Sequence, residues 1–319
     1  MIKITPALLT ILLNSLLLSA SVLAATDSET TAAEDMLTEV LITAPESRYV
    51  APTRRDQIGC IWTPIYINDQ GPFRFVLDTG ATHSAVTAAV ATALNLTPDT
   101  SSNVILRGVT GSAVVPTIRV DTLHAGDLLL AGKRLPIITD ALGGSEGILG
   151  TEGLADKRIY INFRHDLIRI TRSHGERADP DFITVPVNFG RGKLLMVDSR
   201  MRLIRLKAII GTGGQVSIAN LTARDALAKR LKGTPTVDNI TGATADVQEG
   251  ESHIAPMMEM SDIQIRSSHI AFGDTQIFKQ WKMTDEPAVL IGMDVLGLLD
   301  TLVIDYQRAE LQMKRRTGW

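Results

Sequence analysis

The chain has 319 residues, of which 45% are hydrophobic and 4% aromatic, and its formal net charge is -3 at neutral pH. This length permits two domains with hydrophobic cores, and the small negative charge excludes the basic surface that is typical of nucleic-acid-binding proteins. The six histidines show no metal-ligand spacing, and Cys60 is the only cysteine. We therefore expect no nucleic-acid partner, no metal, no cofactor and no intramolecular disulfide.

The amino terminus has the pattern of a secretory signal peptide. Lys3 precedes an apolar run over residues 7–23, and a small-residue cleavage site follows at 22–25. These features predict a signal peptide over residues 1–24 and an exported, periplasmic protein. An uncleaved membrane anchor is the alternative, because the apolar run is close to the shortest that spans a bilayer. Residues 25–55 are rich in Thr, Ala, Glu and Pro, which predicts a flexible leader.

The rest of the chain repeats itself. Three landmarks recur in the same order and at similar separation: VLDTG and IIGTG, GVTG and NITG, and ILG and LIG. An apolar strand pattern follows the last landmark of each copy. Self-similarity of this kind indicates a tandem duplication, with copies at 56–172 and 183–319 and a linker at 173–182.

Short apolar segments bounded by glycines predict strands within each copy. The stretches Ala85–Leu96 and Ile218–Leu231 are rich in alanine and leucine at helical spacing, which predicts a helix in each copy. The sequence therefore predicts a mainly β fold with a few short helices, arranged as two similar lobes.

The segment FVLDTGA, Phe75–Ala81, resembles the active-site turn of the aspartic peptidases, and its Ala81 resembles the retropepsin-like branch of clan AA. A glycine-containing flap hairpin with Thr110, Gly111 and Ser112, followed by the ILG signature, extends the resemblance over most of the first copy and more weakly over the second. The resemblance implies two retropepsin-like or pepsin-like closed β lobes related by a pseudo-twofold duplication. It also implies a bacterial, exported endopeptidase that acts on a peptide or protein substrate.

The chemistry of this family explains the residue types. Two facing carboxylates share one proton, so that one can deprotonate a water while the other polarises the scissile carbonyl. In this sequence Asp78 would be the catalytic carboxylate, and Thr79, Gly80 and Ala81 would support it. The threonine hydroxyl can hydrogen-bond across the pair of turns, and the glycine permits the partner turn to approach closely.

The second copy departs from this pattern, because Gly211 stands where the second aspartate is expected, while Thr212 and Gly213 are retained. Two chains could form a homodimer in which each supplies one Asp78, or the two lobes could pair within one chain around a single carboxylate. The retained Thr212 and Gly213 favour internal pairing, because these residues have a use only at a contact between lobes. We expect an aspartic endopeptidase, and the alternative is a catalytically dead, two-lobed peptide-binding pseudoprotease.

Overall fold

The computed structural model describes residues 38–41, 45–46, 62–139, 144–244 and 246–316. The expected signal peptide lies outside the described residues, and so does most of the expected leader, of which two strands are described, β1 (Thr38–Leu41) and β2 (Pro45–Glu46). In the described part of the chain, no helix combines the length and the apolar character that a membrane crossing needs.

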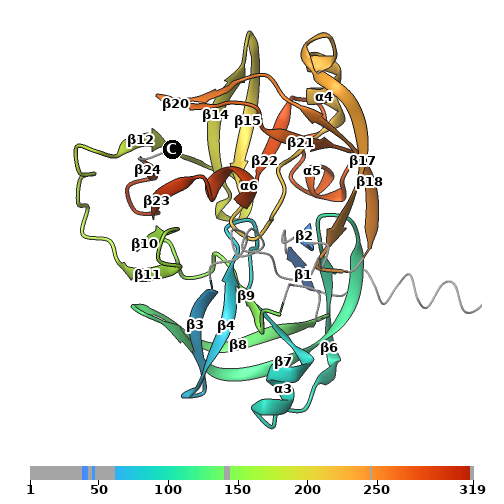
Figure 1. The fold of residues 1–319 in the computed structure, drawn as a ribbon. Coiled ribbons are helices and arrows are strands. Elements are labelled where there is room, and N and C mark those ends of the chain that lie inside the picture. Colours follow the sequence, from blue (N-terminus) through green and yellow to red (C-terminus); the bar gives the residue numbers. More distant parts are fainter. Residues whose placement is uncertain (1–37, 42–44, 47–61, 140–143, 245, 317–319) are drawn as a thin grey trace, which may run out of the picture. The chain divides into compact units, whose positions relative to one another are not determined.

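The first lobe is built from strands and one short helix (Figure 1). Its elements are β3 (Trp62–Ile67), β4 (Gln70–Leu77), β5 (Ala85–Thr87), α3 (Ala88–Ala93), β6 (Asp99–Arg107), β7 (Ser112–Ala125), β8 (Leu128–Ile138) and β9 (Gly147–Leu149). The strand order is β1-β6-β7-β3-β4-β9-β5-β8, and a further pairing of β7 with β8 closes six of these strands into a barrel.

The second lobe forms an eleven-stranded sheet that curls without closing. Its order is β2-β17-β18-β21-β16-β22-β15-β14-β19-β20, with β13 beside β14. The strands are β13 (Asn188–Phe189), β14 (Leu195–Met201), β15 (Ile204–Ile210), β16 (Ile218–Ala219), β17 (Lys232–Gly242), β18 (Val247–Ile254), β19 (Met258–Met260), β20 (Ile263–Ile265), β21 (His269–Phe272) and β22 (Ala288–Ile291). The helices are α4 (Leu221–Leu227), α5 (Gln276–Gln280) and α6 (Met293–Leu296), with 3-10 turns at Arg191–Lys193 and Ala228–Arg230.

The two lobes share one pattern of strand pairing. In the first lobe β9 pairs in parallel with β4 and antiparallel with β5, and β5 pairs in parallel with β8. In the second lobe β22 pairs in parallel with β15 and antiparallel with β16, and β16 pairs in parallel with β21. The predicted fold class, mainly β with two lobes related by duplication, is therefore confirmed.

The predicted helices are wrong at their amino-terminal ends. Ala85–Thr87 is completely buried and forms β5 between β8 and β9, so α3 covers only Ala88–Ala93. In the second lobe α4 begins after Asn220, whose side chain accepts a hydrogen bond of 2.8 Å from the backbone N–H of Ala223. Tertiary strand pairing overrides helix propensity at these alanine-rich positions.

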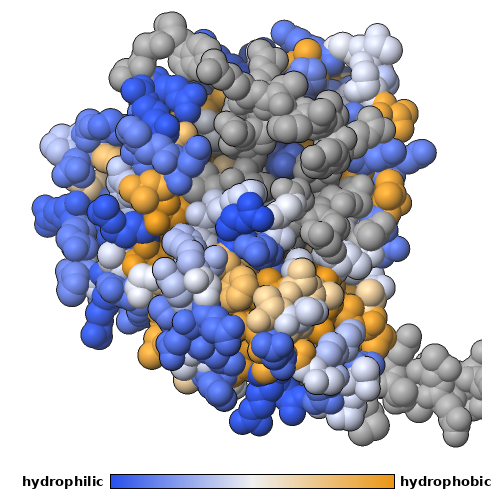
Figure 2. Space-filling view, turned by 60° about the horizontal axis from the view of Figure 1, so that its bottom comes forward, coloured by the Kyte–Doolittle hydropathy of each residue, from blue (hydrophilic) through white to orange (hydrophobic). Residues whose placement is uncertain are grey.

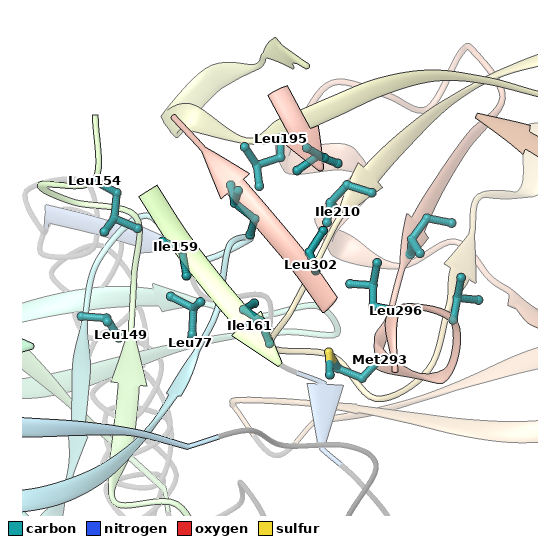
Figure 3. Packing of buried hydrophobic residues seen from close by; sticks show 14 of the residues in the cluster. Leu77, Leu149, Leu154, Ile159, Ile161, Leu195, Ile210, Met293, Leu296 and Leu302 are labelled. Carbon is teal, nitrogen blue, oxygen red and sulfur yellow. The ribbon is translucent and has the colours of Figure 1, made fainter. Parts of the chain in front are cut away.

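A separate five-stranded sheet joins the two copies. Its order is β11-β10-β23-β24-β12, with β10 (Lys157–Asn162), β11 (Leu167–Arg172), β12 (Ile183–Pro186), β23 (Leu299–Asp305) and β24 (Glu310–Arg315). Strands β10 and β23, one from each copy, pair antiparallel with Tyr160 opposite Val303. Figure 3 shows the core at this junction, where Ile159, Ile161 and Leu302 from this sheet lie among Leu77 and Ile210, one from each lobe.

The surface of the described residues mixes polar and apolar groups. On the face in Figure 2, hydrophobic residues lie among hydrophilic ones. The exposed large hydrophobic side chains among the described residues are Val114, Leu129, Leu167, Leu203, Val216, Val237, Val247 and Leu298. They come from both lobes, from β11 of the joining sheet and from the connection between α6 and β23.

Candidate active site

Asp78 begins the turn that follows β4, and its side chain is 0% exposed. The preceding Leu77 is buried and pairs with Leu149 of β9, which fixes the strand that carries the aspartate. The backbone N–H of Asp78 donates to the carbonyl of Leu149 (2.9 Å), and the N–H of Gly80 donates to the Asp78 carboxylate at Oδ1 (2.8 Å). The turn therefore holds the carboxylate through its own backbone.

Two threonines tie the first turn to its counterpart in the second lobe. The Thr79 hydroxyl donates to the carbonyl of Ile210 (2.5 Å), and the Thr212 hydroxyl donates to the carbonyl of Leu77 (2.6 Å). Each hydroxyl also accepts the backbone N–H of the other threonine, at 3.1 Å for Thr79 N–H and 3.2 Å for Thr212 N–H. The structure thus brings the D-T-G and G-T-G turns together within one chain, with the twofold symmetry expected of a duplication.

The glycine that faces Asp78 is Gly213. A Cβ atom added to Gly213 would overlap the carboxyl group of Asp78, so only glycine fits there without displacement. This contact agrees with the expected close approach of the partner turn.

Gly211, where a second aspartate was expected, adjoins a different group. A Cβ atom on Gly211 would lie 2.6 Å from Cδ1 of Leu290 and 3.7 Å from the carbonyl oxygen of Ile291. Leu290 pairs with Ile209 in β15, as Ile148 pairs with Val76 in β4, so Leu290 and Ile148 are equivalent in the two lobes. The Leu290 side chain therefore occupies the space into which a side chain at 211 would first extend.

A buried serine supports each turn from behind. The N–H of Gly150 donates to the Ser84 hydroxyl (3.1 Å), and the N–H of Gly292 donates to the Ser217 hydroxyl (3.0 Å). Both serines are 0% exposed. The two serines occupy the same position in the repeat, so the alignment of the copies could have identified them.

Each serine is bound in turn by a carboxylate. Glu152 accepts the N–H of Ser84 (2.9 Å), and Asp294 accepts both the N–H (3.0 Å) and the hydroxyl (2.7 Å) of Ser217. Burial raises the pKa of Asp294 above its ordinary value, and the hydrogen bonds from Ser217 oppose this increase. These carboxylates act on the framework of the turns.

The predicted flap residues lie where two hairpins meet. Thr110 and Gly111 occupy the turn between β6 and β7, and Ser112 begins β7. The Thr110 hydroxyl donates to the carbonyl of Asp246 (2.7 Å) in the turn between β17 and β18. A Cβ atom on Gly111 would overlap the Asp246 side chain, so glycine permits the two tips to touch.

The first flap also docks against α5 of the second lobe. Val109 is 0% exposed and belongs to the same apolar cluster as Ile277 and Phe278. The N–H of Ile277 donates to the carbonyl of Val109 (3.2 Å), and the side chain of Gln276 donates to the hydroxyl of Ser112 (2.6 Å). The flaps are therefore in a closed arrangement, held by apolar packing and hydrogen bonds.

Tyr306 interacts electrostatically with Asp78 and was not identified from the sequence. It is buried and stacks on Phe189 with ring centroids 5.9 Å apart, and its hydroxyl has no hydrogen-bond partner among the described residues. Burial raises the pKa of Tyr306 far above its ordinary value, and the negative charge of Asp78 raises it further. The phenol therefore stays neutral and is coupled electrostatically to Asp78.

Among the described residues, no group of three or more His, Cys, Asp or Glu side chains could hold a metal ion.

Residues 63–152 match the model of a protein family described as Aspartyl protease. A search of curated proteins returned no match. The matched segment contains the D-T-G turn, the first flap and the ILG signature, and it ends within the loop after β9. The match supports peptidase activity in general, and it does not extend to the G-T-G turn. In sequence, residues 63–152 of this chain are therefore similar to the aspartyl proteases.

Proposed function

We propose that this protein is an exported, retropepsin-like aspartic endopeptidase whose general acid–base group is Asp78. The observation that carries the proposal is the buried Asp78 carboxylate in a turn that Thr79 and Thr212 bind to its counterpart in the second lobe. The family match over the first lobe supports the same reaction class. The signal-peptide pattern at the amino terminus supports a periplasmic location.

Asp78 would carry both proton transfers. Because Gly211 supplies no second carboxylate, the ionised Asp78 would take a proton from the attacking water while the water oxygen bonds to the scissile carbonyl carbon. The same carboxyl group would then return the proton to the leaving nitrogen as the C–N bond breaks. A positioned acid–base group of this kind contributes about 10²–10⁴-fold to a rate.

The decisive experiment replaces Asp78 with asparagine. Asp78→Asn keeps nearly the same shape but removes the titrating group, so we expect hydrolysis of a broad peptide library to fall at least about 100-fold. The matched control is Asp69→Asn, the same change at an exposed turn position with positive φ, which should leave the rate unchanged. Full turnover by a folded Asp78→Asn protein would show that the chemistry lies elsewhere.

A second candidate function has one specific observation in its favour. The Leu290 side chain adjoins the position from which a second carboxylate would project. An apolar side chain at that position is expected in a protein that has lost catalysis and kept peptide binding. The same library separates the candidates when it is read for binding as well as for cleavage. Binding without cleavage, equal in the wild type and in Asp78→Asn, would establish the peptide-binding pseudoprotease.

A further inference from the structure

Two strands of the leader add to the flap hairpins. Strand β2 pairs antiparallel with β17 of the second flap, with Glu46 opposite Thr241 and Pro45 opposite Gly242. Strand β1 lies next to β6 of the first flap in the sheet order. In both cases the leader takes the outer position beside a flap strand whose other edge is already paired, with β18 or with β7 (Figure 1).

We propose that the leader strands β1 and β2 are tethered peptide ligands of the flaps, and that β2 occupies the edge of the second flap which an extended peptide would otherwise bind. An open strand edge presents unpaired N–H and C=O groups, and extended peptides bind such edges by adding a strand. This inference rests on the proposed function, because it takes the flaps as the cover of a peptide-binding site.

The location of the pairing supports this role. β2 meets β17 at its last two residues, Thr241 and Gly242, directly before the turn that contacts the first flap through Thr110 and Asp246. A Cβ atom on Gly242 would lie 2.6 Å from the Thr110 hydroxyl. The leader strand β2 therefore lies where the two flaps converge. A peptide that enters there would meet a strand edge that is already paired with β2.

The backbone pattern defines which groups the leader uses. The N–H of Gly242 donates to the carbonyl of Asp246 within the hairpin (3.3 Å). Because N–H and C=O groups alternate in direction along a strand, those of the preceding Thr241 point toward β2 and pair with Glu46. Pro45, which has no N–H, stands opposite Gly242 at the position that needs no donor.

The covalent tether favours the leader over a free peptide. Glu46 and Trp62, the first residue of β3, belong to the same chain, and a short tether gives a ligand an effective concentration in about the millimolar range. A free peptide at micromolar concentration would therefore be excluded while the leader is paired. Weakening the pairing should admit it.

The test compares the full mature chain with two variants at one position. Glu46→Pro removes the N–H that faces Thr241 and places a ring at the pairing edge, while Glu46→Ala keeps the N–H. Hydrogen exchange of the segment that contains Thr241 should become at least about tenfold faster in Glu46→Pro and stay at the wild-type rate in Glu46→Ala. A fluorescent peptide with the sequence TEVLITAPE, a copy of residues 38–46, should bind Glu46→Pro about tenfold more tightly than the other two proteins.

Equal exchange of this segment in all three proteins would overturn the pairing. Faster exchange in Glu46→Pro without tighter binding of the peptide would overturn the exclusion of other peptides. Hydrogen exchange and peptide binding can both be measured without hydrolysis. An inactive wild-type protein would therefore count against the proposed peptidase, while exchange and binding would still decide this inference.

Discussion

At the scale of single residues, the two turns differ by one functional group and its neighbour. Ile148 pairs with Val76, two residues before Asp78, and the equivalent Leu290 pairs with Ile209, two residues before Gly211, with its side chain against Gly211. A Cβ atom at 211 would meet Cδ1 of Leu290, and valine has no methyl group as far from the backbone as that atom. The absence of a carboxylate at 211 and the Leu290 methyl group beside that position therefore form one local difference, which a single substitution would not reverse.

We predict that Gly211→Asp alone is strained and that Gly211→Asp with Leu290→Val, which removes the δ methyl groups, is less strained. In the single variant the Leu290 methyl group must move, and overpacking of this kind costs about 1–3 kcal/mol of folding free energy. In the double variant two carboxylates can share a proton, so hydrolysis of a peptide library should rise at least about tenfold at mildly acidic pH. Urea unfolding and initial rates measure the two effects.

The control for this gain is Gly211→Asn with Leu290→Val, which has the same shape without the second titrating group. It should show wild-type hydrolysis. An equal gain in the asparagine control would contradict the reconstruction of a carboxylate pair.

Asp294 gives a second prediction at the residue scale. Its pKa in the folded protein is raised above the ordinary value of 3.8, chiefly by burial. A raised carboxyl pKa contributes stability that is complete below the unfolded pKa and is lost as pH rises through the folded pKa. Asp294→Asn removes this pH-dependent loss of stability. It also replaces one of the two carboxylate oxygens that accept hydrogen bonds from Ser217.

We therefore expect Asp294→Asn to be less stable than the wild type at pH 3, with a deficit that shrinks as pH rises toward 7. Urea unfolding at several pH values measures the trend. A deficit that grows over this range would show that the folded pKa of Asp294 is lowered.

At the scale of elements, the contact between the turns is a hydrogen-bonded unit. Thr79→Val and Thr212→Val each remove a hydroxyl that donates to the opposite lobe and accepts from it. Each should cost about 1–3 kcal/mol of unfolding free energy, because buried partners lose their hydrogen bonds. Since the two hydroxyls serve the same contact, the double variant should deviate from additivity by at least about 0.5 kcal/mol in urea unfolding.

Thr92→Val is the control for these variants, because its hydroxyl donates to Ala88 within α3 at an exposed site. It should be nearly neutral. Strictly additive costs at Thr79 and Thr212 would contradict a shared contact between the lobes.

The sequence was sufficient to predict elements whose cause is local or repeated. Apolar runs bounded by glycine predicted the strands. The retained GTG landmark predicted that Thr212 contacts the first lobe, and in the structure its hydroxyl donates to the carbonyl of Leu77. The strand β5 was not predicted, because the burial of Ala85–Thr87 comes from partners distant in the chain. The same reason applies to Leu290 beside Gly211 and to Tyr306 near Asp78, since side-chain contacts between distant strands leave no pattern in a single sequence.

At the scale of the whole molecule, the internal pairing of the lobes bears on the oligomeric state. A homodimer built on two copies of Asp78 would need the face of the first turn that Thr212 already covers. We therefore propose a monomer and predict that native mass spectrometry of the exported protein gives one chain that begins at or near Ala25. A dimer that cleaves peptides would contradict internal pairing, and a chain that retains Met1 would contradict removal of the signal peptide.

The sheet that joins the two copies also determines the order in which the molecule can fold. The pairings among strands β3 to β9 of the first lobe all lie within residues 62–149, but Arg158 bonds Asp305 across 147 residues, and Thr79 bonds Ile210 across 131. Contacts at such separation form slowly, because a long loop must close before they gain free energy. The first barrel can therefore acquire its structure early, whereas the pair of turns around Asp78 is completed only when the second copy arrives. A folding intermediate of this chain would contain the aspartate and its turn with no partner beneath it, and the assembled site would be the last feature of the molecule to form.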